Sequence, residues 1–484
     1  MLQPPPPADA QRLREFLNEQ GYNHAEFRKR SVSQEIPKRS AGNLPYLLDQ
    51  VREPSTPNLL LRWFLLGVPA ERETAAGLIP EPILKILEES GLLVREGGLL
   101  APAVMLTPCA EYIFASDTAA SLDAQFPGVV IWPNPTTRLL EQFTIRRPVA
   151  ATLDLGAGCG IQAILAARHS THVAATDLNP RAREFTAFNA RLNGIENVEC
   201  LTGDTFDTVR GRTFDLIVAN PPFFITPSGD QMYCENSMEL DAYCRRVVRE
   251  APGHLNDGGF LQMTLEWVQV HGETWQERIR GWFGGTGCDA WVFHHYARAA
   301  AAYARERRDT TPAAHDAEML ARWIEYYRER GVEQVHGGIL AMRRRAGRHW
   351  VRIEEVPVDP GEPFGEAVWQ AFAGIDFLER HAAGEELLAA RPRLSPAARL
   401  EQQLRQVDGR WQLEAVNLRL TAGIPASLRL EPAVADFVAG LDGRQTLGEL
   451  ATALAERVPA DPAVVRAECM AVVRKLLERR FLVV

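Results

Sequence analysis

The chain carries a glycine-rich turn, LDLGAGCG, at residues 153–160. This turn ends an apolar strand and opens a helix whose apolar residues recur at helical spacing. Gly156, Gly158 and Gly160 let the backbone turn tightly and approach a ligand, and the start of the helix offers free N–H groups. Asp154 stands two positions before the first glycine, where a carboxylate suits a cationic amino-acid group better than a pyrophosphate. Because such a turn also occurs as a purely structural element, the positions that follow it must decide between the two interpretations.

Two more carboxylates stand at the ends of predicted strands. Asp177 ends the second strand, 19 residues after Gly158, where a carboxylate can accept both hydroxyls of a ribose. Leu178 follows directly and is assigned to the same site. Asp204, after Gly203 at the end of the third strand, can accept from an adenine amino group, although Gly-Asp is also ordinary turn chemistry. Together with the glycine turn, these positions predict a site for a nucleoside-containing cofactor.

The fourth strand runs directly into Asn220-Pro221-Pro222-Phe223. Two consecutive prolines prevent a helix and fix the backbone, so the Asn220 side chain is held at the edge where α/β sheets bind ligands. This arrangement fits methylation of a nitrogen attached to a planar sp² group. The Asn220 amide oxygen and the Pro221 carbonyl would accept its N–H bonds, and Phe223 would stack on its planar face. Asn220, Pro221 and Phe223 are therefore the predicted catalytic residues, although in isolation the motif also reads as a turn after a buried strand.

LDLGAGCG, ATDLNP, the Gly-Asp after the third strand and VANPPF together resemble the class I methyltransferases that modify amide or exocyclic amino nitrogens. Two groups are similar over roughly residues 125–345: the release-factor glutamine methyltransferases and the ribosomal RNA guanine-N2 methyltransferases. The resemblance implies a seven-stranded sheet whose last strand is antiparallel, and S-adenosylmethionine as the cofactor. The residues expected to bind this cofactor are Asp154, Gly156, Gly158, Gly160, Asp177, Leu178, Asp204 and Asn220.

Two departures from the glutamine enzymes leave the acceptor open. Residues 129–140 are similar to their P-R-P-x-T-E segment, but Asn134 replaces the arginine and Arg138 the glutamate. Phe223 stands where these enzymes usually carry tyrosine, and N-P-P-F is commoner among RNA enzymes. The favoured acceptor is a glutamine or peptide amide in a protein. The alternatives are an exocyclic amine of an RNA base and a non-catalytic binding protein on a methyltransferase scaffold.

Strands that alternate with helices in the middle of the chain predict a parallel sheet covered by helices. A helix is expected after the second strand, with Asn179 as its N-cap and Asn193-Gly194 at its end. A further segment, 349–356, is expected to pair with the seventh strand. The seven predicted strands cover residues 151–156, 172–177, 198–203, 214–220, 260–268, 288–296 and 336–344.

Three domains are expected: an N-terminal domain (1–125), the catalytic domain (126–364) and a C-terminal domain (365–484). In the first, a helix feeds a hairpin at Gly97-Gly98, an arrangement similar to a small winged helix. The C-terminal domain is expected to be mostly helical, with a linker at 391–395. Its last part is expected to contain three helices followed by a short strand, and it is similar to winged-helix domains that bind peptides. The fold class is therefore α/β: a Rossmann-like seven-stranded core with helical, winged-helix-like domains at both ends.

The chain has 484 residues and a net charge of −9, so it is not an electrostatic nucleic-acid binder as a whole. Three basic runs, 28–30, 305–308 and 343–345, could still contact RNA phosphates or an acidic protein, although such runs are usually only solvated. We therefore expect a macromolecular substrate, with a protein or peptide favoured over RNA. The segment 225–240, with Met232 and Tyr233, is interpreted either as a loop that closes over this substrate or as a surface loop.

The sequence predicts neither a membrane partner nor a metal. No run of 18 or more apolar residues occurs, and the N-terminus does not read as a secretion signal. Seven scattered cysteines lack a C-x-x-C pair, which argues against a disulfide framework and a zinc site. His294 and His295 are neighbours on a predicted strand and point to opposite faces, so they are expected to be structural. The expected compartment is the cytoplasm.

Overall fold

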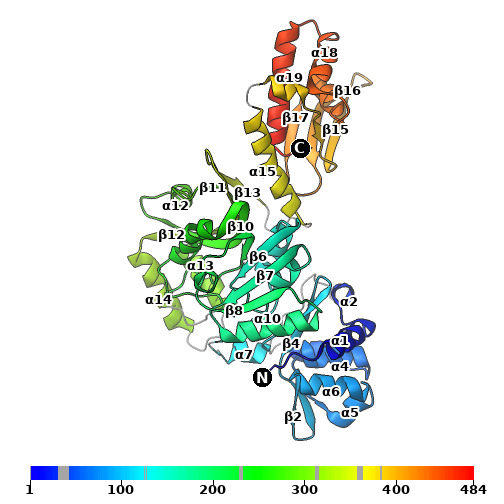
Figure 1. The fold of residues 1–484 in the computed structure, drawn as a ribbon, viewed down its shortest axis with the longest axis vertical. Coiled ribbons are helices and arrows are strands. Elements are labelled where there is room, and N and C mark those ends of the chain that lie inside the picture. Colours follow the sequence, from blue (N-terminus) through cyan, green and yellow to red (C-terminus); the bar gives the residue numbers. More distant parts are fainter. Residues whose placement is uncertain are drawn as a thin grey trace. The chain divides into compact units, whose positions relative to one another are not determined.

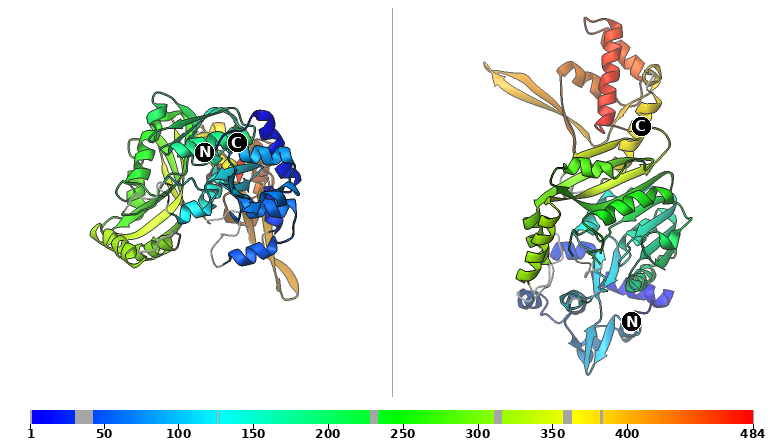
Figure 2. Two further views of the ribbon diagram at one scale, coloured as in Figure 1. Left: turned by 90° about the horizontal axis from the view of Figure 1, so that it is seen from below. Right: turned by 90° about the vertical axis from the view of Figure 1, so that its left-hand side faces the viewer.

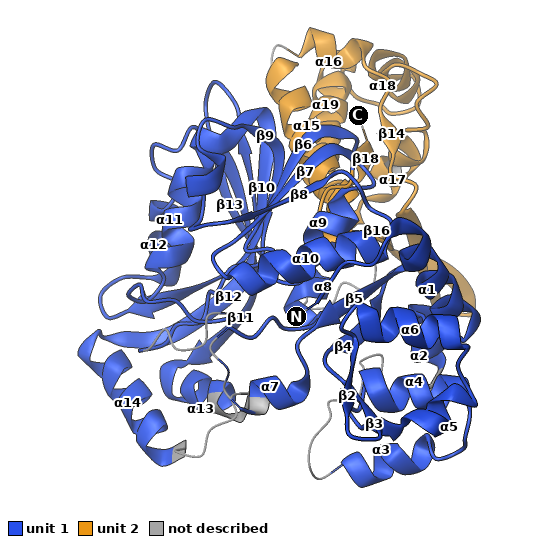
Figure 3. Cartoon of the chain, turned by 60° about the horizontal axis from the view of Figure 1, so that its bottom comes forward, with its two compact units in different colours: residues 1–141, 147–355 blue, residues 142–146, 356–484 orange. Residues whose placement is uncertain are grey.

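The computed structural model describes residues 2–30, 43–124, 126, 128–227, 233–310, 316–356, 363–381 and 384–483. The chain divides into two compact units (Figure 3). Unit 1 contains residues 1–141 and 147–355, and unit 2 contains residues 142–146 and 356–484. The predicted boundary near residue 125 thus falls inside unit 1, whereas the second boundary lies close to the predicted residue 364. The division into three domains stays a proposal.

Unit 1 is built on a mixed sheet of eight strands in the order β13-β11-β12-β10-β9-β6-β7-β8 (Figure 1). Strands β8, β7, β6, β9 and β10 are parallel, and β12 is antiparallel to both of its neighbours. The strands are β6 (Val149–Leu155), β7 (Ser170–Asp177), β8 (Val198–Thr202), β9 (Phe214–Ala219), β10 (Leu255–Val270), β11 (Cys288–Ala299), β12 (Val332–Arg344) and β13 (Val351–Glu355). The predicted α/β, Rossmann-like core is confirmed, and its seventh strand, β12, is the antiparallel one.

The edge of this sheet differs from the prediction. The segment expected to pair with β12 forms an eighth strand, β13, which pairs in parallel with β11. The reason is that β12 already bonds to β10 along one side and to β11 along the other, so only the outer side of β11 is free. The expected number of seven strands was therefore one too few.

Helices connect and cover these strands: α9 (Ile161–Ala166), α10 (Pro180–Leu192), α11 (Ala242–Glu250), α12 (Trp275–Gly281), α13 (Ala300–Thr310) and α14 (Asp316–Glu329), with the 3₁₀ helices η1 (Asp207–Val209) and η2 (Ala251–His254). The predicted helix after β7 is α10. The Asn179 side chain accepts from the Arg181 N–H at 3.0 Å, and Gly194 follows its end at φ +70°. This cap fixes where α10 begins, directly behind the carboxyl end of β7.

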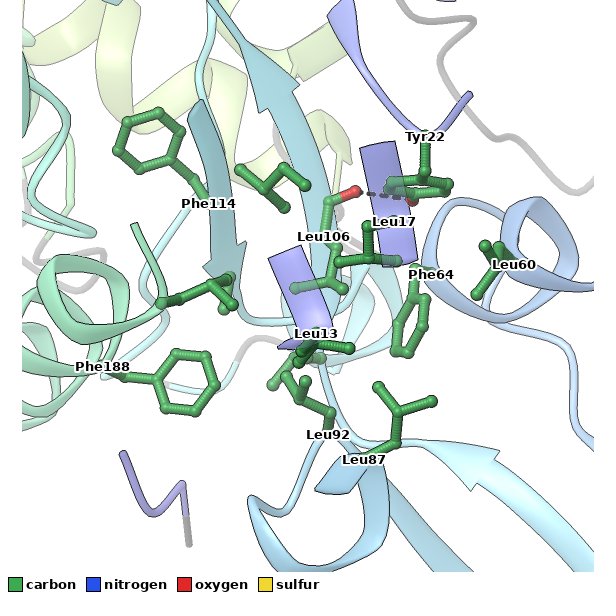
Figure 4. Packing of buried hydrophobic residues seen from close by; sticks show 14 of the residues in the cluster. Leu13, Leu17, Tyr22, Leu60, Phe64, Leu87, Leu92, Leu106, Phe114 and Phe188 are labelled. Carbon is green, nitrogen blue, oxygen red and sulfur yellow. Dashed lines mark hydrogen bonds between the residues drawn. The ribbon is translucent and has the colours of Figure 1, made fainter. Parts of the chain in front are cut away.

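The N-terminal part of unit 1 shares its core with helices α9 and α10, which cover the sheet. Buried Leu13, Leu17 and Phe64 lie in one cluster with Phe188 of α10 (Figure 4). Its elements are α1 (Pro7–Glu19), α2 (His24–Arg30), α3 (Leu44–Gln50), α4 (Thr56–Phe64), β1 (Ala70–Glu71), α5 (Arg72–Ala76), α6 (Glu81–Glu89), β2 (Leu93–Glu96), β3 (Leu99–Pro102), β4 (Met105–Cys109), β5 (Tyr112–Ser116), α7 (Ala119–Asp123) and α8 (Pro135–Phe143).

Hydrogen bonds explain why residue 125 does not separate two units. The buried Asn189 side chain donates to the Ala115 carbonyl at 2.9 Å and accepts from its N–H at 2.7 Å. Asn193, one helical turn later, makes the same pair of bonds to Ile113. Asparagine side chains in and directly after α10 thus satisfy the backbone N–H and C=O groups of two residues of β5. The predicted hairpin after α6 is present as β2 and β3, and the winged-helix interpretation stays a prediction.

Unit 2 contains α15 (Gly365–Arg380), α16 (Glu385–Ala389), β14 (Arg393–Leu394), β15 (Ala398–Val407), β16 (Arg410–Leu420), β17 (Ser427–Leu430), α17 (Pro432–Ala439), α18 (Leu447–Ala455), α19 (Pro462–Glu478) and β18 (Leu482–Val483). The expected order of three helices and a short strand at the end is confirmed. The expectation of a mostly helical region was wrong for 398–430, where β15, β16 and β17 form an antiparallel sheet. Figure 2 shows β15 and β16, in orange, as an arm that extends past the helices of this unit. The predicted linker also pairs inside the unit, as β14 with β18.

Candidate functional site

A cavity of about 460 Å³ lies at the carboxyl ends of β6, β7 and β9. It brings together seven of the predicted site residues: Asp154, Gly156, Gly158, Asp177, Leu178, Asp204 and Asn220. Gly160, Pro221 and Phe223 do not line it in the described part of the chain. Most of the residues predicted to bind the cofactor therefore line one cavity together with Asn220.

The glycine turn has two parts with different roles. Gly156 and Gly158 have φ +74° and +57°, and a Cβ added to either would meet no protein atom within 4 Å. At these positions only glycine leaves the backbone both left-handed and open to a ligand. At Gly160, with φ +84°, an added Cβ would lie 2.7 Å from Cγ2 of Thr186. Gly160 thus allows α9 and α10 to pack closely, and its contact with the cofactor stays a prediction.

The Asp177 carboxylate is fixed by two backbone groups. One oxygen accepts from the Gly158 N–H at 2.8 Å and the other from the Asn179 N–H at 2.8 Å. Burial raises its pKa, and these two bonds oppose the rise. Each carboxylate oxygen keeps a further lone pair. The carboxylate is therefore oriented before any ligand arrives, with acceptor capacity left for two hydroxyls. Leu178 beside it lines the cavity while 56% exposed, an apolar surface suited to a ring face.

Asp154 lies deeper, at the end of β6. One of its oxygens accepts from the Ala163 N–H of α9 at 2.8 Å, and the residue is only 2% exposed. Burial is the main reason that its pKa is raised to about 7, and the nearby Asp177 carboxylate adds to the rise. A buried carboxyl with a raised pKa gains most from a cation beside it. This environment supports the predicted contact with a cationic amino group.

Asp204 has protein partners that the sequence did not indicate. Its carboxylate accepts from the Thr205 hydroxyl at 2.5 Å and pairs with the Arg246 guanidinium at 3.1 Å. The Thr205 bond, followed by the Arg246 pair, lowers the pKa of Asp204. Arg246 also lines the cavity, so a guanidinium cation lies beside the Asp204 carboxylate there. No local motif marks Arg246, because it comes from α11, more than 40 residues later in the chain.

At the acceptor end, the Asn220 amide is held by a residue of the neighbouring strand. The Thr264 hydroxyl donates to Oδ1 of Asn220 at 2.6 Å, and the Asn236 side chain donates to the Pro222 carbonyl at 2.7 Å. Asn220, Pro222 and Asn236 all line the cavity. The loop after β9 is thus bonded at both its asparagine and its second proline.

Phe223 does not lie where the sequence interpretation put it. Its ring is 8% exposed, belongs to the core cluster around the sheet and meets the Phe224 ring edge-on at 5.5 Å. Packing explains the difference, because a ring that follows two prolines at the end of a buried strand can turn back into the core. The wall of the cavity on this side comes instead from Tyr233, Glu235, Asn236, Ser237 and Met238, in the second half of the predicted loop. Met232 lies outside the described residues.

The segment before β6 supplies the remaining wall, including Ile131, Trp132 and Thr137. Asn134, which departs from the arginine of the glutamine enzymes, accepts from the Thr137 N–H at 2.9 Å. It also accepts from the Thr136 and Thr137 hydroxyls. This set of bonds caps α8, so Asn134 orders the segment that lines the cavity.

His294 bonds to another histidine. Its Nε2 lies 3.1 Å from Nδ1 of His336, and the Trp275 ring stacks on both. Across the described ranges, no three His, Cys, Asp or Glu side chains gather as a metal site would require, and no helix is both long and apolar enough to cross a bilayer.

Comparisons with known proteins agree with this geometry. Residues 134–271 match the methyltransferase small domain, and residues 370–484 match a domain of unknown function, DUF7782. The release factor glutamine methyltransferase of Geobacter sulfurreducens is 30% identical over 212 residues, which are 40% of this chain and 72% of that enzyme. Ribosomal RNA small subunit methyltransferase C of Escherichia coli is 37% identical over 113 residues, 23% of this chain and 29% of that enzyme.

Among solved structures, the 16S rRNA N2 G1207 methyltransferase of T. thermophilus, in complex with AdoMet and guanosine, is similar at 15% identity with a TM-score of 0.29, over 57% of this chain and 64% of that one. The small-domain match spans β6 to β10, the strands that carry the cavity. The match to the Geobacter glutamine enzyme spans more than two thirds of the length of that enzyme. With S-adenosylmethionine as its cofactor, this chain belongs to the class I methyltransferases.

Proposed function

We propose that the enzyme methylates a planar sp² nitrogen, and that this nitrogen belongs to a glutamine side chain or another peptide amide of a protein. The observation that carries the proposal is the placement of Asn220. Its amide lines the same cavity as Asp154 and Asp177, and its oxygen is oriented by Thr264. An amide oxygen has two lone pairs, so the one that Thr264 leaves can accept an N–H from the substrate.

The cavity fits the cofactor. The carboxylate of Asp177 is oriented for two hydroxyls, Leu178 offers an apolar face, and Asp154 suits an amino group. Asp204, although paired with Arg246, keeps lone pairs for an exocyclic amine. When bound, S-adenosylmethionine supplies a methyl group on a positively charged sulfur.

The chain's own residues then position the acceptor. Asn220 would hold the N–H of the substrate nitrogen and so aim the lone pair of that nitrogen at the bound methyl donor. The nitrogen would take up the methyl group that the cofactor supplies and would lose its proton to water. No strong general base is needed. Holding two reactants in line can supply up to about 7–11 kcal/mol of the barrier reduction.

The basic runs favour a protein acceptor over RNA. Arg343 and Arg345 both bond to the buried Asp289 carboxylate, and Arg344 donates to the Leu255 carbonyl at 2.5 Å. Arg307, in the second run, pairs with the buried Glu266. Guanidinium groups bonded inside the fold have fewer donors left for phosphates. The Geobacter relative, named for glutamine methylation, supports the same acceptor class.

An exocyclic amine of an RNA base is the second candidate. N-P-P-F at 220–223 and the similarity to the Escherichia coli ribosomal RNA enzyme favour it. The reduced, unpaired state of all seven cysteines suits the cytoplasm, where we place either reaction.

Radiolabelled S-adenosylmethionine, added with the purified enzyme to lysate of cells that lack its gene, tests the proposal. We expect label in a protein band that protease removes and ribonuclease does not, and amino-acid analysis should recover N-methylglutamine. Label removed by ribonuclease would support the RNA candidate instead. Cofactor binding without label in any fraction would contradict both and favour a binding protein.

A further inference from the structure

Strand β10 buries polar side chains on one of its two faces. Leu261, Met263, Leu265 and Trp267 alternate with Gln262, Thr264 and Glu266. These three polar residues are 0%, 2% and 0% exposed, respectively. A polar group removed from water costs free energy unless it finds a hydrogen-bond partner. These three side chains therefore need hydrogen-bond partners on that face of β10. The partners of Thr264 and Glu266 show which neighbouring segments these two residues fix.

Thr264 faces the catalytic motif because of the strand register. Met263 of β10 lies opposite Ala219, the last residue of β9, so Thr264 stands beside Asn220 where the neighbouring chain leaves the sheet. The resulting bond, from the Thr264 hydroxyl to Oδ1 of Asn220, measures 2.6 Å. Thr264 does not line the cavity, whereas Asn220 does. Thr264 thus touches the acceptor site only through the Asn220 amide.

Glu266, two residues further on the same face, is linked through Tyr303 to the residue that follows the Asn-Pro-Pro-Phe-Phe segment. Its carboxylate accepts from the Tyr303 hydroxyl at 2.5 Å, and the Tyr303 oxygen accepts from the Ile225 N–H at 3.2 Å. Ile225 follows the Asn-Pro-Pro-Phe-Phe segment directly. One face of β10 is therefore linked to the chain on both sides of the prolines.

We infer that Thr264 is a positioning residue for methyl transfer: its hydroxyl keeps the Asn220 oxygen, rather than the NH₂ group, available to the acceptor nitrogen. The inference rests on the proposed function, in which Asn220 accepts from that nitrogen. Without the hydroxyl, the amide can rotate about its last side-chain bond. For part of the time it then presents NH₂, which cannot accept a hydrogen bond.

The test compares Thr264→Val, which keeps the shape and removes the hydroxyl, with Thr264→Ser, which keeps the hydroxyl. Thr107→Val is the matched control, because Thr107 is fully buried in β4 and its hydroxyl has no hydrogen-bond partner among the described residues. Each full-length variant is assayed with labelled S-adenosylmethionine and lysate of cells lacking the gene, and calorimetry measures its affinity for the cofactor.

We expect the maximal rate of Thr264→Val to fall by roughly tenfold, the upper end of what one neutral hydrogen bond supplies. Affinity for the cofactor should stay within about twofold. Thr264→Ser should restore most of the rate, and Thr107→Val should match the wild type. A role limited to stability would instead lower the melting temperature of Thr264→Val and leave its maximal rate unchanged. That result would overturn the inference.

A second readout separates this inference from the proposed function. Neutron crystal structures of wild type and Thr264→Val, both with S-adenosylhomocysteine, distinguish the amide oxygen of Asn220 from its NH₂ group in the absence of any acceptor. A rotated or multiply placed amide in the variant supports the positioning role, even if the wild type labels nothing and the proposed function fails. An amide that keeps its wild-type position refutes the role, whatever the lysate shows.

Discussion

The Asp177 carboxylate accepts from the Gly158 N–H at 2.8 Å, so the end of β7 is bonded to the glycine turn that follows β6. The two predicted parts of the cofactor site are thus joined by a hydrogen bond. Asp177→Ala should weaken binding of S-adenosylmethionine by about 1.5–3 kcal/mol, because it removes charge-assisted bonds to the ribose and loosens the turn. Calorimetry measures the loss.

Asp207→Ala is the control for this change, since Asp207 is an exposed aspartate of η1 that pairs with Arg210 and does not line the cavity in the described part of the chain. Asp177→Asn should lie between the wild type and the alanine variant, because an amide retains one acceptor oxygen. An unchanged affinity in a folded Asp177→Ala protein would disprove the ribose assignment.

Asn220→Ala should reduce methyl transfer to background while affinity for S-adenosylmethionine stays within about threefold. In the proposed mechanism the amide contacts the acceptor, and its contribution is made mainly in the transition state. Asn256→Ala is a matched control, because Asn256 also bonds through its side chain, to Asp215, but at the amino ends of the strands. Near-normal turnover in Asn220→Ala would rule out the planar-nitrogen mechanism.

The position of a site residue could be predicted from sequence where it depends only on the neighbouring residues in the chain. Asp177 is the last residue of β7, and the glycine turn and Asn220 directly follow β6 and β9, so their order along the chain was enough to predict that they line one cavity. Thr264 could not be found in this way, because its contact depends on which residue of β10 lies opposite Ala219. A signal did exist: polar residues at every second position of a strand that a parallel sheet buries on both faces.

The strands β15 and β16 also could not be predicted, because they depend on pairing between two segments. In β15 and β16 both faces are largely exposed, so apolar and polar residues do not alternate strictly. Leu400 and Leu404 are four residues apart, a spacing that also fits a helix. Only pairing between β15 and β16 distinguishes the two structures, and pairing is not a property of either segment alone.

Phe223→Ala should lower the free energy of unfolding by about 3–5 kcal/mol, the usual cost of removing a ring from a packed core. Phe223→Leu should cost less and keep most of the activity. Denaturation in urea measures the effect, with the exposed Tyr46→Ala as the control. Normal stability combined with a selective loss of acceptor binding would show that the ring stacks on the substrate after all.

Affinity for the cofactor should depend on pH through Asp154. Its pKa is raised to about 7 in the folded chain. The unfolded chain loses this proton near its ordinary value, so without cofactor the contribution of Asp154 to stability is present at low pH and disappears as the pH rises through about 7. A cationic amino group binds the ionised form. Affinity should therefore rise from about pH 5.5 to about pH 7, by up to roughly tenfold per unit.

Calorimetry at several pH values on wild type and Asp154→Asn checks this expectation. The asparagine variant should bind weakly and show a much flatter profile, since the titrating group is gone. A wild-type profile that Asp154→Asn leaves unchanged would assign the pH dependence to another group and remove Asp154 from the amino-group contact.

Unit 2 should select the macromolecular substrate. It has its own core, with Leu387, Val438 and Phe481 fully buried, and its charge does not favour nucleic acid. Because α15 contributes Phe377 and Leu378 to that core, the chain is cut after Glu355, which removes all of unit 2 except residues 142–146, instead of at the predicted linker near Pro392. The shortened chain should bind S-adenosylmethionine within about twofold and label lysate protein at least roughly tenfold less, because a second binding module raises the effective affinity for a shared partner.

If the shortened chain is insoluble or loses cofactor binding, unit 2 stabilises the fold. If it is soluble and labels lysate as well as the full chain, unit 2 has no role in recognition.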